Sequence, residues 1–295
     1  MPTSLNISVD VLIGQLMLGL INGSFYAVLS LGMAIIFGIL QIVNFAHGAQ
    51  YMMGAFVAWM LLTYLGINYW VALVAAPLIV GLFGVLLERF LIRRIYNIDH
   101  MYGFLLTYGV ALIVESILRA EYGVAGRPYS APAALRGAFD FDFMMLPIYR
   151  LWVVLASIVT CVVTWTVIER TRLGAYLRAA QENPSLLRAF GINVPLMITI
   201  TYGMGVALAA FAGVLAAPIY QVSPIMGSNL IVVVFAVVVI GGMGSIGGAI
   251  LTGFGLGLIE GLAKIFYPPI ANTVVFIAMI MILTFRPAGL FGNAR

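Results

Sequence analysis

The stretch TRLGAYLRAAQENPSLLRAFGINVP, residues 171–195, is a polar, arginine-bearing segment between long apolar runs. Asn183 followed by Pro184 predicts the start of a short helix, because Asn is a favoured N-cap and Pro suits the first helical position. Gly191 stands where a residue that ends this helix is expected. The segment therefore predicts a short helix outside the apolar runs that flank it.

Between these two ends, Leu186, Leu187 and Phe190 form an apolar stripe on one face of the predicted helix. A helix of about two turns is marginal in water, so the stripe needs a surface to pack on. Two interpretations remain open on shape alone. The stripe packs on the protein's own membrane helices or on lipid head groups, or it binds a groove on a cytosolic partner.

The rest of the chain has the composition of a polytopic membrane protein. Of its 295 residues, 63% are hydrophobic and 8% are charged, whereas a soluble domain carries about 25% charged residues. The single cysteine, Cys161, excludes an internal disulfide. The first ten residues contain no basic region, which predicts that no signal peptide is cleaved. We expect an all-α bundle with one domain over residues 1–295.

A helix needs about 20 apolar residues to cross a bilayer, and the apolar runs predict eight or nine membrane-spanning segments. The number of spans depends on residues 31–47 and 239–250, because each is a candidate broken or re-entrant segment. The predicted spans are 11–38, 48–66, 68–90, 101–119, 150–169, 196–217, 228–243, 249–267 and 270–285.

The basic residues predict the orientation of these spans. If residues 171–195 are cytoplasmic, alternation places nine of the 14 Lys and Arg residues on that side, in agreement with the positive-inside rule. The N-terminus is then outside and the C-terminus cytoplasmic. The net charge of +4 reflects this topology rather than nucleic-acid binding. The nine residues are Arg89, Arg93, Arg94, Arg170, Arg172, Arg178, Arg188, Arg286 and Arg295.

The longest connection outside the membrane is residues 120–149. Its FDFDF motif at 139–143 alternates Phe and Asp, which predicts a short strand with one apolar face. The loop either covers the helix ends or provides a landing surface for an outside partner, and the sequence favours neither interpretation.

A parallel internal repeat is a further hypothesis. Gly48-Ala49 opens the second predicted span and Gly248-Ala249 opens the eighth, and both spans run in the same direction. In transporters built from such repeats, the transport site lies near the bilayer midplane between the two halves.

Residues 241–248, GGMGSIGG, form the densest glycine cluster. The only lysine, Lys264, lacks the preceding glycines of a P-loop, so the run is no ATP cradle and any ATP energy comes from another chain. Because dense glycine bends or interrupts a helix, the run is either a tight cytoplasmic turn or a moving constriction. The candidate gate or hinge residues are Gly241, Gly242, Gly244, Gly247 and Gly248.

Four polar residues are candidates for the wall of a solute path: Asn22, Tyr26, Asn44 and His47. Asn22 and Tyr26 are four residues apart and share one helix face. Each candidate also has a structural interpretation, since Asn22 and Tyr26 suit bonds to a neighbouring helix and a lone histidine suits a buried structural role. Two separated histidines and one cysteine predict no metal site.

Glu115 and Glu260 are the deepest acids, and each has a basic residue four positions later, Arg119 and Lys264. Each pair can meet on one helix face, which lowers the roughly 2.5–3.5 kcal/mol cost of an unpaired charge at mid-bilayer. We expect both pairs to neutralise locally and extend toward the interface, and a proton relay is the alternative. No hydrolase or metalloprotease motif occurs, which predicts a non-catalytic chain.

Three motifs together resemble the LivH-type permeases of ABC importers for branched-chain amino acids and related small solutes. They are NFAHG at 44–48 with YMMGAFVA at 51–58, LGAYLRAAQENPSLLRAFGIN at 173–193, and GGMGSIGGAILTG at 241–253. With PAGLFG at 287–292, the resemblance covers nearly the whole chain.

The resemblance implies a role for residues 171–195 as the coupling segment that docks on an ATPase, related to the EAA loop of ABC permeases. This implication favours the partner-docking interpretation of the apolar stripe. The implied coupling residues are Gly174, Arg178, Ala179, Ala180, Glu182, Pro184, Leu186, Leu187, Arg188, Phe190 and Gly191.

The resemblance also implies partners and a location. They are a second membrane subunit of the LivM type, two cytosolic ATPase subunits of the LivF and LivG type, and a periplasmic or extracellular solute-binding protein. ATP and Mg bind to the ATPase subunits, and this chain binds no cofactor. The implied location is the bacterial inner membrane.

Two positions depart from the family pattern. Many members carry an acid where this chain has Ala49, and a small residue is common where it has Gln41. The solute therefore stays open among branched-chain amino acids, urea, amides and aromatic acids. The alternative function is a self-sufficient secondary transporter or channel, which needs ion-coupling acids.

Overall fold

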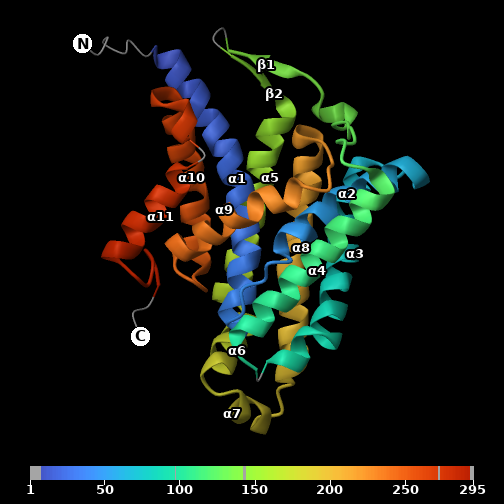
Figure 1. The fold of residues 1–295 in the computed structure, drawn as a ribbon, viewed down its shortest axis with the longest axis vertical. Coiled ribbons are helices and arrows are strands. Elements are labelled where there is room, and N and C mark those ends of the chain that lie inside the picture. Colours follow the sequence, from blue (N-terminus) through green and yellow to red (C-terminus); the bar gives the residue numbers. More distant parts are fainter. Residues whose placement is uncertain (1–7, 97, 142–143, 272, 293–295) are drawn as a thin grey trace.

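The computed structural model describes residues 8–96, 98–141, 144–271 and 273–292 as a bundle of long helices (Figure 1). The bounds of its α-helices are α1 (Val9–Leu40), α2 (His47–Leu65), α3 (Tyr69–Phe90), α4 (His100–Tyr122), α5 (Ile148–Arg170), α6 (Arg172–Glu182), α7 (Pro184–Ala189), α8 (Val194–Tyr220), α9 (Met226–Gly241), α10 (Ile246–Phe266) and α11 (Val274–Phe285). Short 3-10 helices lie at Ile92–Ile95, Ala133–Leu135 and Pro268–Ile270, and the strands are β1 (Ala138–Asp140) and β2 (Met145–Pro147).

Six helices of the described chain, α1, α3, α4, α5, α8 and α10, are long and apolar enough to cross a membrane. Helices α9 and α11 are shorter and apolar, and α2 has 19 residues with a polar first turn. Each of the nine predicted spans coincides with one of these helices, which confirms the all-α polytopic class.

Helix α1 is the centre of the bundle and is almost wholly buried from Gly19 to Ile36. It packs on α10 through backbone contacts between glycines. A Cβ added at Gly257 would lie only 2.3 Å from the Cα of Gly23. Small residues let membrane helices approach this closely, and dispersion forces then replace the hydrophobic effect that lipid cannot supply.

The two candidate broken segments have different outcomes. Residues 31–40 simply continue α1, so the re-entrant alternative at 31–47 is wrong for that part, whereas the broken alternative holds at 41–46, which are non-helical. Gln41 ends α1 with a left-handed backbone, φ 54°. The segment 239–250 is not re-entrant either, because a four-residue turn joins α9 to α10 there.

The ends of the bundle are distinct (Figure 1). Strands β1 and β2 and the start of α1 lie at one end, which we call the hairpin end. Helices α6 and α7 lie at the other end, which we call the coupling end after the role that the sequence resemblance implies for residues 171–195. The strand predicted in FDFDF exists as β1, paired antiparallel with β2. It is shorter than predicted and its Phe139 side chain is half exposed, so it has no buried apolar face. Asp142 and Phe143 lie outside the described residues.

The connection between α4 and α5 is attached to the connection between α8 and α9. Arg127 and Val222 exchange two backbone hydrogen bonds of 2.8 and 2.9 Å. Nearby, Tyr129 packs beside Tyr69, and burial raises the pKa of Tyr129 to about 12, so its hydroxyl stays protonated near neutral pH. The loop therefore covers the helix ends at the hairpin end.

Candidate functional site

The coupling segment begins its short helix as the sequence predicts. The Asn183 side chain accepts a hydrogen bond of 3.0 Å from the Leu186 backbone N–H, and Pro184 occupies the first helical turn of α7. Gly191 follows the end of the helix with φ 80°, a conformation that other residues seldom adopt. These three positions fix where α7 starts and stops.

The apolar stripe on α7 divides into two parts. Leu187 is buried, in a cluster with Ala180 and Val194, so it fastens α7 to α6 and α8. Leu186 is 53% exposed and Phe190 75% exposed. The first interpretation therefore holds for Leu187, which packs on the protein itself, whereas Leu186 and Phe190 stay exposed.

Helix α6 is fixed tightly to the end of α5. A Cβ added at Gly174 would lie 1.6 Å from the carbonyl oxygen of Ile168, so only glycine fits there. Arg178 donates to the same carbonyl at 3.3 Å and forms an ion pair with Glu169 at 3.2 Å. Ala180 is buried and Ala179 half-buried, whereas Glu182 and Arg188 are exposed. A shift of α6 therefore moves the end of α5.

A cavity of about 490 Å³, which we call the coupling-side cavity, lies between α6 and residues 241–248, which we call the glycine turn. Its walls include Gly38 and Gln41 at the end of α1, and Arg178 and Gln181 on α6. The turn residues 243–246 and the C-terminal residues 287, 288, 291 and 292 close the other side. The coupling segment and the glycine turn, far apart in sequence, are therefore opposite walls of one space.

The C-terminal segment holds the glycine turn in place. Leu290 N–H donates to the Ile240 carbonyl at 2.8 Å, and Phe291 N–H donates to the Gly241 carbonyl at 3.2 Å. These bonds satisfy carbonyls that the end of α9 would otherwise leave unpaired. The result is a tight, fastened turn, which agrees with the first interpretation of residues 241–248.

Within this turn the glycines are not equivalent. A Cβ at Gly248 would lie 2.1 Å from the Gly241 carbonyl oxygen, whereas a Cβ at Gly247 would meet nothing within 4 Å. Gly242 and Gly244 have φ 98° and 86°. Four of the five candidate hinge glycines are thus required by close contact or backbone conformation, and Gly247 by neither.

A second cavity, of about 360 Å³, lies toward the hairpin end, and we call it the hairpin-side cavity. Its wall is formed by α1, α2, the end of α8 and the start of α9. The lining residues are Asn22, Phe25, Tyr26, Tyr51, Tyr220, Ser223, Ile225, Met226, Asn229 and Leu230. Asn22 and Tyr26, two of the four predicted wall residues, are therefore placed on a cavity wall.

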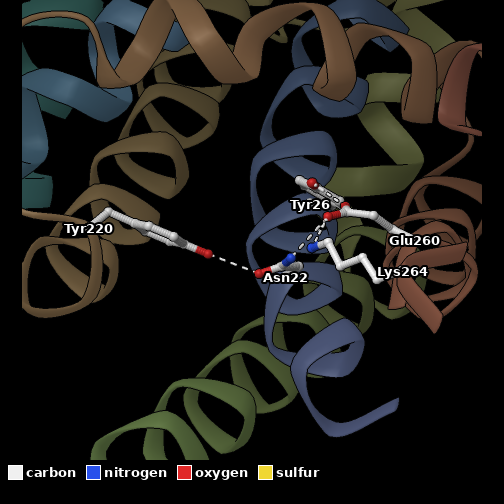
Figure 2. A network of polar contacts seen from close by, with 5 residues as sticks. All are labelled: Asn22, Tyr26, Tyr220, Glu260 and Lys264. Atoms are coloured by element: carbon white, nitrogen blue, oxygen red, sulfur yellow. Dashed lines mark hydrogen bonds and ion pairs between the residues drawn. The ribbon is translucent and has the colours of Figure 1, made fainter. Parts of the chain in front are cut away.

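A chain of polar contacts crosses the bundle beside this cavity (Figure 2). Glu260 on α10 accepts hydrogen bonds from Asn22 at 3.2 Å and from Tyr26 at 2.7 Å. Tyr220 on α8 donates to the Asn22 side-chain carbonyl at 2.9 Å, and Lys264 pairs with Glu260 at 2.6 Å. The predicted sharing of one face by Asn22 and Tyr26 is confirmed, and both bond to a neighbouring helix.

Both predicted ion pairs form, since Arg119 also lies 2.6 Å from Glu115. The expectation that Glu260 extends outward is wrong, because this residue is only 5% exposed and faces α1. Sequence reasoning missed the contacts of Glu260 with α1 and the wall roles of Tyr51 and Tyr220. Nothing local marks these residues, because their partners come from other helices.

Asn44 and His47 occupy a different place. His47 is fully buried with its Nε2 2.9 Å from the Leu29 carbonyl. Asn44 donates to the Gln50 side chain at 3.0 Å and accepts from the Ala46 N–H at 3.1 Å. They fix the connection of α1 to α2 and line neither the coupling-side cavity nor the hairpin-side cavity, so this conformation does not support their predicted wall role.

The structure also places Gln41 and Ala49, the two residues that depart from the family pattern. Gln41 is the left-handed residue that caps α1, a position where glycine or asparagine is favoured. Ala49 lies on a smaller cavity of about 210 Å³ whose wall also contains Glu115 and Ser228. An acid thus reaches this cavity from α4 instead of from α2.

These features define a multi-pass helical membrane permease, with a cavity of about 360 Å³ toward one end and a short helix that exposes apolar side chains at the other. The chain belongs to the family described as branched-chain amino acid transport system / permease component, whose model matches residues 15–285.

Curated relatives extend over nearly the full length. The chain is 31% identical to the high-affinity branched-chain amino acid transport system permease protein BraD of Pseudomonas aeruginosa, with 95% of each chain covered. It is 29% identical to the corresponding protein LivH of Escherichia coli K12, again with 95% of each covered. A probable branched-chain amino acid transport permease protein LivH of Methanocaldococcus jannaschii is 26% identical, over 92% of this chain and 90% of that one. No solved structure matches the chain.

Proposed function

We propose that this chain is the non-catalytic transmembrane subunit of an ABC importer that moves a branched-chain amino acid or a similar small organic acid or amide. The names of the relatives, which are permease proteins of high-affinity branched-chain amino acid transport systems, support the solute class. A small cavity of about 360 Å³ suits such a solute, because small-molecule sites occupy about 300–1,000 Å³.

The proposal includes the partners that supply energy and solute. A second LivM-type subunit completes the path, two LivF- and LivG-type ATPases bind ATP and Mg, and a periplasmic or extracellular binding protein delivers the solute. The location is the bacterial inner membrane, with the hairpin end and the N-terminus outside and the coupling end and the C-terminus cytoplasmic. The positive-inside distribution of arginines supports this orientation.

The observation that carries the proposal is the divided stripe on α7. Leu187 fixes the helix to the bundle, while Leu186 and Phe190 leave about half and three quarters of their surface exposed. Apolar side chains gathered on a short, anchored helix are typical of a helix that inserts into a groove of a partner. A cytosolic ATPase is the partner that this permease requires.

We propose that a movement of α7 reaches the solute path through the contacts of α6 with α5 and α1. Gly174 and Arg178 join α6 to the end of α5, and Gln181 lies beside Gly38 at the end of α1. A Cβ at Gly38 would also come within 3.5 Å of Gly244. A swing of the coupling segment on ATP binding therefore shifts α1, α5 and the glycine turn together, and the path alternates between the two faces.

Co-purification tests the proposal. The permease, expressed with its partner chains, should retain an ATPase, and the variant Leu186→Ser/Phe190→Ser should lose it by about tenfold or more, since buried interface anchors contribute about 2 kcal/mol each. Val124→Ser, an equally exposed apolar position at the hairpin end, is the control. A permease that transports solute alone, with no ATPase attached, would instead support the secondary transporter or channel.

A further inference from the structure

The hairpin-side cavity has walls of unusual chemistry for a space within a membrane bundle. Three tyrosines, two asparagines and one serine line it together with four apolar residues, Phe25, Ile225, Met226 and Leu230. No charged side chain lines it among the residues that the structure describes. The cavity can therefore offer both hydrogen bonds and apolar contacts to a solute that has a polar part and an apolar part.

The polar network fixes the direction in which the wall hydroxyls bond. Tyr26 donates its proton to Glu260, and Tyr220 donates its proton to Asn22. With those protons engaged, the two hydroxyl oxygens are left to accept hydrogen bonds from anything in the cavity. The wall thus offers acceptors at Tyr26 and Tyr220.

Tyr51 provides the complementary group. Tyr51 is 1% exposed and lines the cavity. Its hydroxyl makes no hydrogen bond with any residue in the described part of the chain. A hydroxyl that borders a cavity can donate its proton to water there or to an acceptor group of a solute. The Tyr51 hydroxyl is therefore a donor to the cavity beside the two oriented acceptors.

The charge of Glu260 lies behind this wall and is balanced by Lys264 at 2.6 Å. A solute with net charge would lose water here without meeting an uncompensated opposite charge, which is unfavourable. A zwitterion or an amide meets the wall better, because it carries both a donor and an acceptor at one end.

We propose that the hairpin-side cavity is a solute site of this subunit for net-neutral solutes with a donor and an acceptor at one end and an apolar other end, and that Glu260 is its positioning residue. Tyr26, Tyr51 and Tyr220 contact the solute head. Glu260 acts through Asn22 and Tyr26, whose orientation it fixes. This inference rests on the proposed function, because the solute that binds in the cavity is the one that the transporter moves.

Solute protection of an engineered cysteine tests the site directly. Cys161 is the only native cysteine of this chain, so a Cys161→Ala background gives this chain a single thiol when Asn229→Cys, on the cavity wall, is added, and labelling is read on this chain after the subunits are separated. The complete transporter in membrane vesicles is treated with a methanethiosulfonate reagent in the presence of L-leucine, L-valine, L-phenylalanine, urea or acetamide, and of L-glutamate or L-lysine. Val124→Cys, exposed at the hairpin end and outside the cavities, is the control.

We expect at least one neutral solute to protect Asn229→Cys, neither charged amino acid to do so, and Val124→Cys never to be protected. Tyr51→Phe should raise the half-protecting concentration roughly two- to tenfold through the lost hydrogen bond. Tyr202→Phe, a buried tyrosine that lines none of the cavities described, should leave it unchanged. Failure of every neutral solute, or equal protection by a charged one, overturns the site. Uptake measured in the same vesicles shows whether the proposed function fails with it.

The positioning role of Glu260 has its own readout. Lys264→Met leaves the carboxylate of Glu260 unbalanced behind Asn22 and Tyr26, so L-lysine should begin to protect Asn229→Cys. Adding Glu260→Gln removes that charge, so L-lysine protection should disappear while neutral solutes protect less well than in the parent. An unchanged order of solutes in both variants would contradict the positioning role, since loss of stability alone does not alter charge preference.

Discussion

The coupling end and the hairpin-side cavity are built in opposite ways. At the coupling end, the main features come from neighbours in sequence: Asn183 caps the helix that Pro184 begins, and Gly191 follows its end. In the cavity, Asn22 meets Glu260 across 238 residues. Local chemistry thus forms the proposed coupling helix at one end, whereas tertiary packing assembles the proposed solute site at the other.

The two regions should also differ in how they tolerate substitutions. A helix that transmits movement needs rigid connections, and Gly174 and Gly248 are packed against backbone atoms. A binding surface needs oriented polar groups, and its side chains are held by hydrogen bonds. Substitutions that add atoms should therefore damage the coupling end most, and substitutions that remove one polar group should affect the cavity.

The largest effect is expected at the glycine turn. Gly248→Ala places a Cβ 2.1 Å from the Gly241 carbonyl oxygen, so the turn must open at a cost of about 1–3 kcal/mol. Solute uptake and thermal stability should both fall sharply. Gly247→Ala, one residue earlier with open space around it, is the matched control and should behave like the parent. Equal behaviour of the two variants would remove the argument for a packed turn.

A smaller, more selective effect is expected at Gly191. Its φ of 80° excludes β-branched residues on conformational grounds, although no atom lies within 4 Å of an added Cβ. Gly191→Val should reorient the start of α8 and lower solute transported per ATP hydrolysed several-fold, with the protein still inserted. Gly191→Asn, which tolerates the left-handed conformation, should retain most coupling. Normal uptake by the valine variant would count heavily against a coupling role for this segment.

The smallest effect is expected at Gln41. A non-glycine residue in the left-handed region costs roughly 1–2 kcal/mol, and Gln41 has φ 54°. Gln41→Gly removes that cost but raises the conformational entropy of the unfolded chain, which favours unfolding. The melting temperature of the detergent-solubilised protein should therefore rise by a few degrees at most. A clear fall would show that the contacts of the Gln41 side chain on the coupling-side cavity outweigh the strain.

What the sequence predicts follows the same division. The cap, the first proline and the final glycine of the α7 region are local signals, and all were predictable, as were the helical ion pairs of Glu115 and Glu260. The partners of Glu260 on α1 were not, because i,i+4 spacing identifies neighbours on one helix only. The role of residues 287–292 in fastening the glycine turn depends on backbone contacts that no residue pattern marks.

The central claim is that α7 presents Phe190 to a cytosolic ATPase. A Phe190→Cys variant in the Cys161→Ala background, reacted with a membrane-impermeant thiol reagent in sealed vesicles, tests it most directly. The account predicts labelling only from the cytoplasmic face, and loss of that labelling when the ATPase subunits are bound. Labelling from the opposite face, or labelling unaffected by the ATPase, would contradict it.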